Sequence, residues 1–195
     1  TALRRDGRAS LITLVAVEGS SPREAGTRML VLADGRYSGT IGGGALEWQA
    51  MAEAQRLMQS QPDGAGEVRS FSLGPDLGQC CGGRVRLLIE AFAVVDLGWI
   101  EKLAAASSAQ PATEGFRDAR GIYSRSLVGA SNGFFWKETG FLHEVHGENR
   151  MPLLLFGAGH VGRALVLALA PLPFTVRWID MRPEAFPAAV PANVT

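Results

Sequence analysis

The chain has 195 residues, of which 47% are hydrophobic and 19% are charged, a composition typical of a soluble globular protein with one large or two small domains. Its 19 basic and 19 acidic residues cancel, which argues against a nucleic-acid partner. No segment has the ~20 apolar residues that a membrane span needs. The apolar run 11–17 is too short and strand-like for a signal peptide, and the adjacent Cys80 and Cys81 make no disulfide framework. We therefore expect a cytoplasmic protein.

The first part of the chain is predicted to be rich in β-strands that end in glycine-rich loops. Asp34-Gly35 is a typical tight-turn pair and predicts a hairpin. Apolar residues recur at intervals of three and four from Leu46 to Met58, which predicts an amphipathic helix. In chain order we expect a strand at 11–17, a loop at 18–26, hairpin strands at 27–32 and 36–41, a helix at 45–59, and strands at 68–73 and 85–92.

The middle of the chain gives weaker signals. We expect a short helix at 99–109, a linker or surface loop at 107–120, and a hairpin formed by strands at 122–128 and 134–145. The polar stretch 146–151 precedes Pro152, so the domain boundary is placed there.

The last part carries a glycine motif, Gly157-Ala-Gly159-His-Val-Gly162, between an apolar run and a helix-compatible segment. Asp180 closes the next apolar run, 18 positions after the third glycine. In this context the motif predicts dinucleotide binding, with Asp180 accepting hydrogen bonds from a ribose hydroxyl. The first two glycines bring the backbone close to a pyrophosphate, and the helix N-terminus offers N–H groups to it.

Only two strands and one helix are predicted in this last part, and two parallel strands cannot bury both faces of a sheet. The expectation is therefore an α/β protein: a mixed, β-rich α+β N-terminal domain over residues 1–150, followed by an incomplete Rossmann-type βαβ domain over 151–195. The exposed strands of an incomplete sheet also favour a homodimer.

Three further glycine-rich loops, at 19–26, 42–47 and 78–83, each follow a predicted strand. Clustered backbone N–H groups in such loops form anion-binding concavities, and Arg23, Arg28 or Arg84 could add bidentate contacts. Ordinary tight turns are the alternative for each loop taken singly. Their convergence on one site is not visible in the sequence.

Cys81 and Glu47 are the side chains with the clearest chemical potential. Cys81 precedes Gly82-Gly83 and Arg84, which would expose its sulfur and favour the thiolate, whereas a buried inert cysteine is the usual alternative. Glu47 opens the first long helix, where it either compensates the helix dipole or acts as a general base or an acceptor for an NH-rich heterocycle. Two adjacent cysteines and scattered histidines do not supply the spacing of a zinc site.

Together, the segments 15–26, 39–47, 79–83 and 155–162 resemble, in order and spacing, the xanthine dehydrogenase accessory family (XdhC/CoxI). The resemblance implies a molybdenum cofactor chaperone that binds molybdopterin. Such a chaperone supports replacement of an oxo ligand by sulfur from a cysteine desulfurase, and assists insertion into xanthine dehydrogenase or a related hydroxylase.

By the same resemblance, Cys81 would contact the molybdenum or its sulfur, and Cys81 and Glu47 would be the chemically active residues. The motif positions expected to bind cofactor are Ser20, Pro22, Arg23, Gly42, Gly43, Gly44, Gly82, Gly83, Gly157, Gly159, Gly162 and Asp180. An accessory protein is favoured over an enzyme.

Two other functions stay open at this stage. The glycine motif and Asp180 are compatible with an NAD(P)-dependent oxidoreductase, although no hydride-relay set such as Tyr-x-x-x-Lys is evident. A scaffold that docks a desulfurase to an apoenzyme would bind partners without binding molybdenum.

Overall fold

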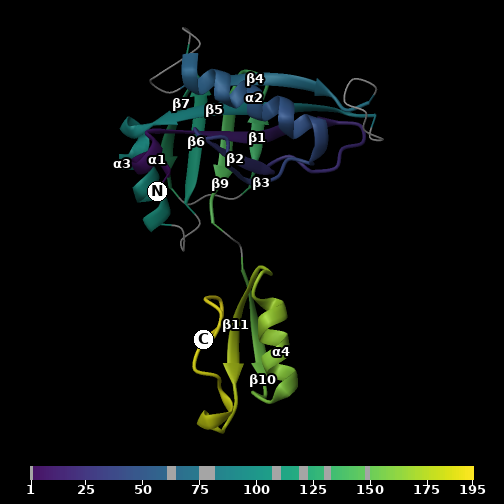
Figure 1. Ribbon diagram of the computed structural model, residues 1–195, viewed down its shortest axis with the longest axis vertical. Helices are drawn as coiled ribbons and strands as arrows, with labels where there is room; N and C mark the ends of the chain where they lie inside the picture. The colour runs from purple at the N-terminus through teal and green to yellow at the C-terminus, as the bar shows by residue number, and fades with distance from the viewer. Residues whose placement is uncertain are drawn as a thin grey trace. The chain divides into compact units, whose positions relative to one another are not determined.

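The computed structural model describes residues 2–60, 65–74, 82–106, 111–118, 123–129, 133–147 and 150–195. The chain divides into two compact units, Thr1–His146 and Gly147–Thr195 (Figure 1). Each unit combines strands with helices, so the predicted mixed α/β class is confirmed.

The first unit is built on a five-stranded antiparallel sheet of order β3-β2-β1-β5-β4. The long strands β1 and β5 pair along their whole length at its centre, from Arg8 opposite Ala93 to Glu18 opposite Arg84. The elements of this half are α1 (Ala2–Asp6), β1 (Arg8–Glu18), β2 (Arg28–Leu32), β3 (Tyr37–Gly39), α2 (Gly44–Ser60), β4 (Ala65–Ser72) and β5 (Arg84–Ala93).

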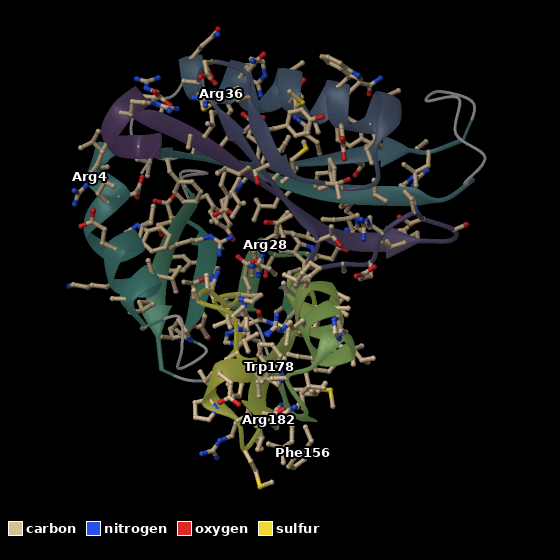
Figure 2. The ribbon with its side chains drawn as sticks, turned by 60° about the horizontal axis from the view of Figure 1, so that its bottom comes forward. Arg4, Arg28, Arg36, Phe156, Trp178 and Arg182 are labelled. Carbon is tan, nitrogen blue, oxygen red and sulfur yellow. The ribbon has the colours of Figure 1, made fainter. Side chains whose placement is uncertain are left out.

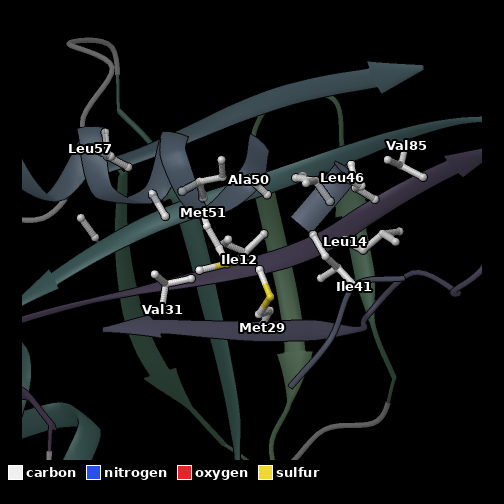
Figure 3. Packing of buried hydrophobic residues seen from close by; sticks show 14 of the residues in the cluster. Ile12, Leu14, Met29, Val31, Ile41, Leu46, Ala50, Met51, Leu57 and Val85 are labelled. Atoms are coloured by element: carbon white, nitrogen blue, oxygen red, sulfur yellow. The ribbon is translucent and has the colours of Figure 1, made fainter. Parts of the chain in front are cut away.

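Helix α2 covers one face of this sheet and forms the main core (Figure 3). Its buried residues Leu46, Ala50, Met51, Ala54, Leu57 and Met58 are the ones that the helical periodicity singled out. They pack against Ile12 and Leu14 of β1 and against Val85 and Leu87 of β5. Because successive side chains of a strand point to opposite faces of the sheet, one set packs under α2 and the other set lies on the opposite face.

The second half of this unit forms a four-stranded sheet of order β7-β6-β9-β8. Two expectations from the sequence were wrong here. Part of the stretch expected to be a linker is strand β6. The expected strand 134–145 is two strands, β8 and β9, which pair with each other, and β7 pairs with β6 and not with either of them. The elements are η1 (Val94–Asp96), α3 (Leu97–Ala105), β6 (Ala112–Arg117), β7 (Tyr123–Val128), β8 (Phe135–Lys137) and β9 (Phe141–Val145).

The two sheets pack face to face, so the unit has three layers: α2, the five-stranded sheet and the four-stranded sheet (Figure 1). Val15 and Leu88 leave the α2 face and pack against Tyr123 and Leu142. A register shift between Leu14 and Ala16 in the pairing of β1 with β5 leaves Val15 as an extra residue on β1. Alternation already directs Val15 toward the second sheet, and the extra residue returns Val17 to the α2 face.

A buried ion network joins the two sheets beside this apolar contact. The guanidinium of Arg125 on β7 binds both carboxylate oxygens of Glu90 on β5 and one oxygen of Glu144 on β9. Side chains of all three residues are at most 2% exposed. Arg28 of β2 binds the other oxygen of Glu144 at 2.8 Å. Burial alone would raise the pKa of Glu144, but the charges of Arg125 and Arg28 lower it below its usual value. Glu144 is therefore a carboxylate at neutral pH.

The second unit is a βαβ arrangement with strands β10 (Met151–Phe156) and β11 (Phe174–Ile179) in parallel and helix α4 (His160–Leu169) between them. A small core gathers around Val166 and Trp178, whereas Phe156 and Arg182 lie on the outside (Figure 2). A short segment η3 (Pro183–Ala185) follows β11.

This unit contains more parallel pairing than the two strands expected from the sequence. Residues 193–195 run parallel to β11 through a bridge between Val176 and Val194, with hydrogen bonds from Val176 N to Asn193 O and from Thr195 N to Val176 O. The Asn193 side chain donates to the carbonyls of Leu169 and Phe174 and anchors the segment. β11 is therefore flanked on both sides.

Replacement of Arg125 tests the ion network. Arg125→Met leaves Glu90 buried without its ion-pair partner and Glu144 with Arg28 alone, and we expect the free energy of unfolding to fall by about 3–5 kcal/mol. Urea denaturation of the full chain measures it. The matched control is Arg56→Met, whose guanidinium is 45% exposed beside Glu53 and Glu67, and whose removal should cost about 1 kcal/mol or less. Equal losses in the two variants would contradict the role of the network.

Two glycines of the α4 loop provide a second matched pair. A Cβ at Gly162 would collide with the carbonyl oxygen of Gly157, whereas a Cβ at Gly159 meets no described atom within 4 Å. Gly159 also has an extended backbone with φ −75°, which alanine adopts. We therefore expect Gly162→Ala to destabilise the second unit and Gly159→Ala to leave it folded, as hydrogen exchange of β10 and β11 would report. Similar protection in both variants would show that α4 can shift without cost.

Candidate functional site

The strand pairing brings three chain segments to one edge of the five-stranded sheet. Arg84, the first residue of β5, pairs with Glu18 at the end of β1 and with Ser72 at the end of β4. The segments that follow β1 and precede β5 therefore begin at the same edge. The glycine-rich segment before α2 joins them there through Gly42.

Backbone contacts lock these segments together. Gly83 N donates to Ser20 O at 3.1 Å, and a Cβ at Gly83 would collide with that carbonyl. A Cβ at Gly19 would lie 3.3 Å from the Cα of Gly83. Gly42, at φ +130°, faces Pro22, whose Cγ lies 2.6 Å from where a Cβ would be. The loop 19–26 thus contacts Gly83 through backbone atoms and Gly42 through the Pro22 ring, and glycine is needed because a side chain at these positions would collide with those atoms.

Glu47 fixes the loop that precedes α2. Its Oε1 accepts three hydrogen bonds, from Thr40 Oγ1 at 2.5 Å, from Ile41 N at 3.0 Å and from Gly43 N at 3.0 Å. Glu47 lies in the first turn of α2, so its charge also complements the partial positive charge of the helix N-terminus. Oε2 takes no part in these three bonds. The structure therefore adds a loop-holding contact to the roles that the sequence suggested for Glu47.

The outer side of the three loops is accessible. Ser20, Pro22, Arg23, Gly44 and Gly82 are exposed. A Cβ at Gly43 or Gly82 would meet no described atom within 4 Å. Ser21 Oγ donates to the carbonyl of Arg23 at 2.9 Å and stabilises the turn that presents Arg23.

This surface combines exposed glycine backbone, a guanidinium and a carboxylate oxygen, which suits a ligand that bears both an anionic group and N–H donors. We call this surface, formed by residues 19–26, 42–47 and 82–84, the glycine-loop edge.

Arg84 is exposed on the glycine-loop edge. Arg28, the third arginine considered from the sequence, instead binds Glu144 between the sheets. Cys80 and Cys81 lie outside the described residues.

The glycine motif of the second unit forms a turn from β10 into α4. Gly157 has φ +96° and its N–H donates to Ile179 O, while Gly159 caps α4 without a side-chain hydrogen bond. Gly162 is the close-packing glycine against Gly157. Gly157 therefore makes the tight turn and Gly162 the close packing that the sequence motif predicts, while the approach of a pyrophosphate to this loop stays a prediction.

Asp180 is already engaged within this unit. Its Oδ2 accepts from Ala158 N at 2.7 Å, and the Arg182 guanidinium and backbone N–H also bind it. The hydrogen bond from the Arg182 side chain, followed by those from the backbone, holds the pKa of Asp180 well below its usual value. A ribose hydroxyl would therefore compete with Arg182 for this carboxylate.

Several side chains lie in environments that the sequence did not reveal. Trp48 of α2 is 74% exposed, because it lies on the side of the helix away from the sheet. His143 on β9 and His146, the residue after β9, are half-buried, and burial lowers the pKa of His146 to about 4. Hydrophobic periodicity could have flagged Trp48, since it falls outside the apolar stripe.

Two searches for other kinds of site were negative within the described ranges. Across that part of the chain, no group of three or more His, Cys, Asp or Glu side chains could hold a metal ion. No helix in the same ranges is long and apolar enough to cross a membrane.

Comparisons with known proteins find relatives over different parts of the chain. The molybdenum cofactor insertion chaperone PaoD of Escherichia coli (strain K12) is 39% identical over 83 residues, which are 42% of this chain and 26% of that protein. The uncharacterized protein YqeB of the same organism is 27% identical over 184 residues, which are 91% of this chain and 24% of that protein. The chain thus spans about a quarter of the length of these relatives.

Among solved structures, a protein of Bacillus halodurans described as a xanthine dehydrogenase matches with a TM-score of 0.77. The match covers 94% of this chain and 61% of that one at 22% sequence identity, which establishes a shared fold. Finally, the model of the XdhC and CoxI family matches residues 2–71. This match confirms the resemblance to that family over the motif segments 15–26 and 39–47, whereas the segments 79–83 and 155–162 lie outside the matched residues.

Proposed function

We propose that this chain takes part in a molybdenum cofactor chaperone, with the glycine-loop edge as the site that holds the cofactor in its molybdopterin form. The observation that carries the proposal is that three separate motifs of the family resemblance meet at one accessible edge, through the Gly83–Ser20 backbone contact and the packing of Gly42 on Pro22. The relationship to PaoD, whose name describes cofactor insertion, supports the same function.

The residues of the edge fit the chemistry of this cargo. Molybdopterin presents a phosphate, an NH-rich pterin and a metal bound through a dithiolene. Exposed backbone at Gly82 and the side chains of Ser20 and Arg23 suit the phosphate. The Oε2 atom of Glu47 suits the pterin N–H groups. The thiolate of Cys81 is a soft ligand of the kind that a thiophilic metal prefers, and we assign it to the molybdenum or its sulfur.

In this proposal the chain binds the cofactor and holds it for transfer. It does not turn over a free substrate. It supports sulfuration by a cysteine desulfurase and then assists insertion into xanthine dehydrogenase or a related hydroxylase. We further propose that the chain works as a homodimer in the cytoplasm. The desulfurase and the hydroxylase follow from the family resemblance, and the homodimer follows from the incomplete sheet of the second unit.

The first test measures molybdenum and oxidised pterin that stay with the protein after incubation with molybdenum cofactor and removal of free ligand. We expect stoichiometric retention of both. Cys81→Ala should lose retention or delivery while the fold survives, and the matched variant Cys80→Ala should keep both. Retention of neither compound by correctly folded wild-type protein would contradict the proposal, and normal activation of a partner hydroxylase by Cys81→Ala would contradict the role of Cys81.

Two substitutions of Glu47 separate its contact with the loop from its contact with the cargo. Glu47→Ala leaves the N–H groups of Ile41 and Gly43 without this acceptor and should lower the free energy of unfolding by about 1–3 kcal/mol. Glu47→Gln keeps an oxygen for the loop but places an amide where the pterin needs an acceptor. We expect this variant to stay nearly as stable as wild type and to hold the cofactor about tenfold more weakly. Wild-type retention by a stable Glu47→Gln protein would show that Glu47 only holds the loop.

A second candidate function, nucleotide binding as in an NAD(P)-dependent oxidoreductase, is favoured by the motif geometry of the second unit. Gly159 leaves open space at the N-terminus of α4, and Gly162 brings that helix close to β10. The Rossmann-type interpretation of residues 151–195 remains a proposal. Calorimetric titration with NAD and NADP tests nucleotide binding, and binding accompanied by turnover would favour the enzyme. Binding of protein partners without binding of nucleotide or molybdenum would favour a scaffold.

A further inference from the structure

A cavity lies at the end of the five-stranded sheet opposite the glycine-loop edge. It has a volume of about 370 Å³ and is lined by residues of α1, β1, β2, β5 and α3, among them Leu3, Ala9, Phe92 and Leu103. Ala9 pairs with Phe92 at the start of β1, whereas the glycine-loop edge follows Glu18 at its end. Nine residues of extended strand separate the two, about 30 Å. Figure 1 shows α1 and α3 together at this end of the unit.

The polar groups that line the cavity limit the class of ligand that it can bind. Only Arg125 and His146 interrupt an otherwise apolar lining among the described residues. The guanidinium of Arg125 is held by the carboxylates of Glu90 and Glu144 and by Thr113 Oγ1 at 2.9 Å. Its charge is compensated and most of its N–H groups are used, so it does not attract an anion into the cavity. The carboxylates in turn are bound to Arg125, so nothing in the wall recruits a cation.

His146 supplies one defined hydrogen-bonding group. Thr113 Oγ1 accepts from Arg125, which can only donate, and lies 2.7 Å from Nε2 of His146. The hydroxyl has one proton, and Nε2 of His146 is its one acceptor among the described residues, so we assign the tautomer in which Oγ1 donates to Nε2. The imidazole proton then resides on Nδ1, which makes no hydrogen bond with any described residue. Burial lowers the pKa of this ring to about 4, so the ring is neutral at physiological pH. The cavity therefore offers one N–H donor from an uncharged group.

Helix α3 forms a wall that a ligand could stabilise. None of its residues is fully buried. Its main anchor is Trp99, which packs edge-on against Phe92 with ring centroids 5.9 Å apart and donates from Nε1 to Asp96 at 3.1 Å. The apolar faces of Trp99, Ile100 and Leu103 border the cavity. A ligand that fills it would remove this apolar surface from water.

We propose that this cavity is a binding site for a neutral, largely apolar small molecule of about two fused rings, with one hydrogen-bond acceptor that meets Nδ1–H of His146. A volume of about 370 Å³ lies at the lower end of the range of ~300–1,000 Å³ found for ligand pockets, and an apolar lining with few polar groups is typical of them. This site does not depend on the proposed cofactor function of the glycine-loop edge.

The test uses two ligands of nearly equal shape, acetylnaphthalene, which has a carbonyl acceptor, and ethylnaphthalene, which has none. Isothermal titration calorimetry with the full chain should show one site for each, with dissociation constants on the order of 10–100 µM. His146→Phe should weaken binding of acetylnaphthalene about fivefold and leave that of ethylnaphthalene within about twofold.

Two substitutions that fill the cavity, one on β1 and one on α3, provide a second test. Ala9→Leu on β1 and Leu103→Trp on the half-exposed helix α3 should each abolish binding of both ligands, and the second variant keeps the test informative if the first fails to fold. Ala164→Leu, the same change as in the first variant at an exposed position of α4, is the matched control and should bind as wild type does. No binding of either ligand by wild-type protein, or unchanged binding after the cavity is filled, would overturn the proposal. An equal effect of His146→Phe on both ligands would overturn the role of the donor.

Discussion

The antiparallel pairing of β1 with β5 is the constraint on which the first unit depends. These two strands are the longest in the sheet, and their register runs from Arg8 opposite Ala93 to Glu18 opposite Arg84. That register decides what lies at each end: the glycine loops beyond Glu18, and the apolar cavity around Ala9. Because side chains alternate along a strand, the same register sends Leu87 toward α2 and Leu88 and Glu90 toward the second sheet.

The fold was predictable where one local signal decides the structure. Asp34-Gly35 predicts the β2–β3 hairpin, and the apolar spacing from Leu46 to Met58 predicts α2 with its buried face, because turn geometry and helical periodicity are local. Strand β6 was missed, since Ala-Thr-Glu-Gly-Phe-Arg has no clear alternation, and its pairing with both β7 and β9 comes from distant residues. Arg125, Glu90 and Glu144 are likewise far apart in sequence, so no spacing rule connects them.

The candidate site was predictable by residue type but not by geometry. The sequence gives glycines at strand ends, and only the structure shows that Gly19, Gly42 and Gly83 serve contacts between loops. At Gly43 and Gly82 a Cβ would meet no described atom within 4 Å. This distinction separates glycines that hold the loops together from glycines that leave room for a ligand. A side chain at the first kind would disturb the fold. At Gly82 it would obstruct only the binding surface, whereas at Gly43 the positive φ of +84° would also strain the backbone.

A carboxylate holds a glycine loop in each unit. Glu47 accepts from Ile41 N and Gly43 N in the first unit, and Asp180 accepts from Ala158 N in the second. A carboxylate that binds backbone N–H groups fixes a loop in advance, so a ligand need not order that loop when it binds. The same bonds occupy acceptor capacity that a ligand could use. Glu47 uses Oε1 for its three loop contacts, whereas Asp180 also has Arg182 on both of its oxygens. The glycine-loop edge is therefore the better prepared of the two sites to receive an N–H donor from a ligand, which is why the proposed function places the pterin there.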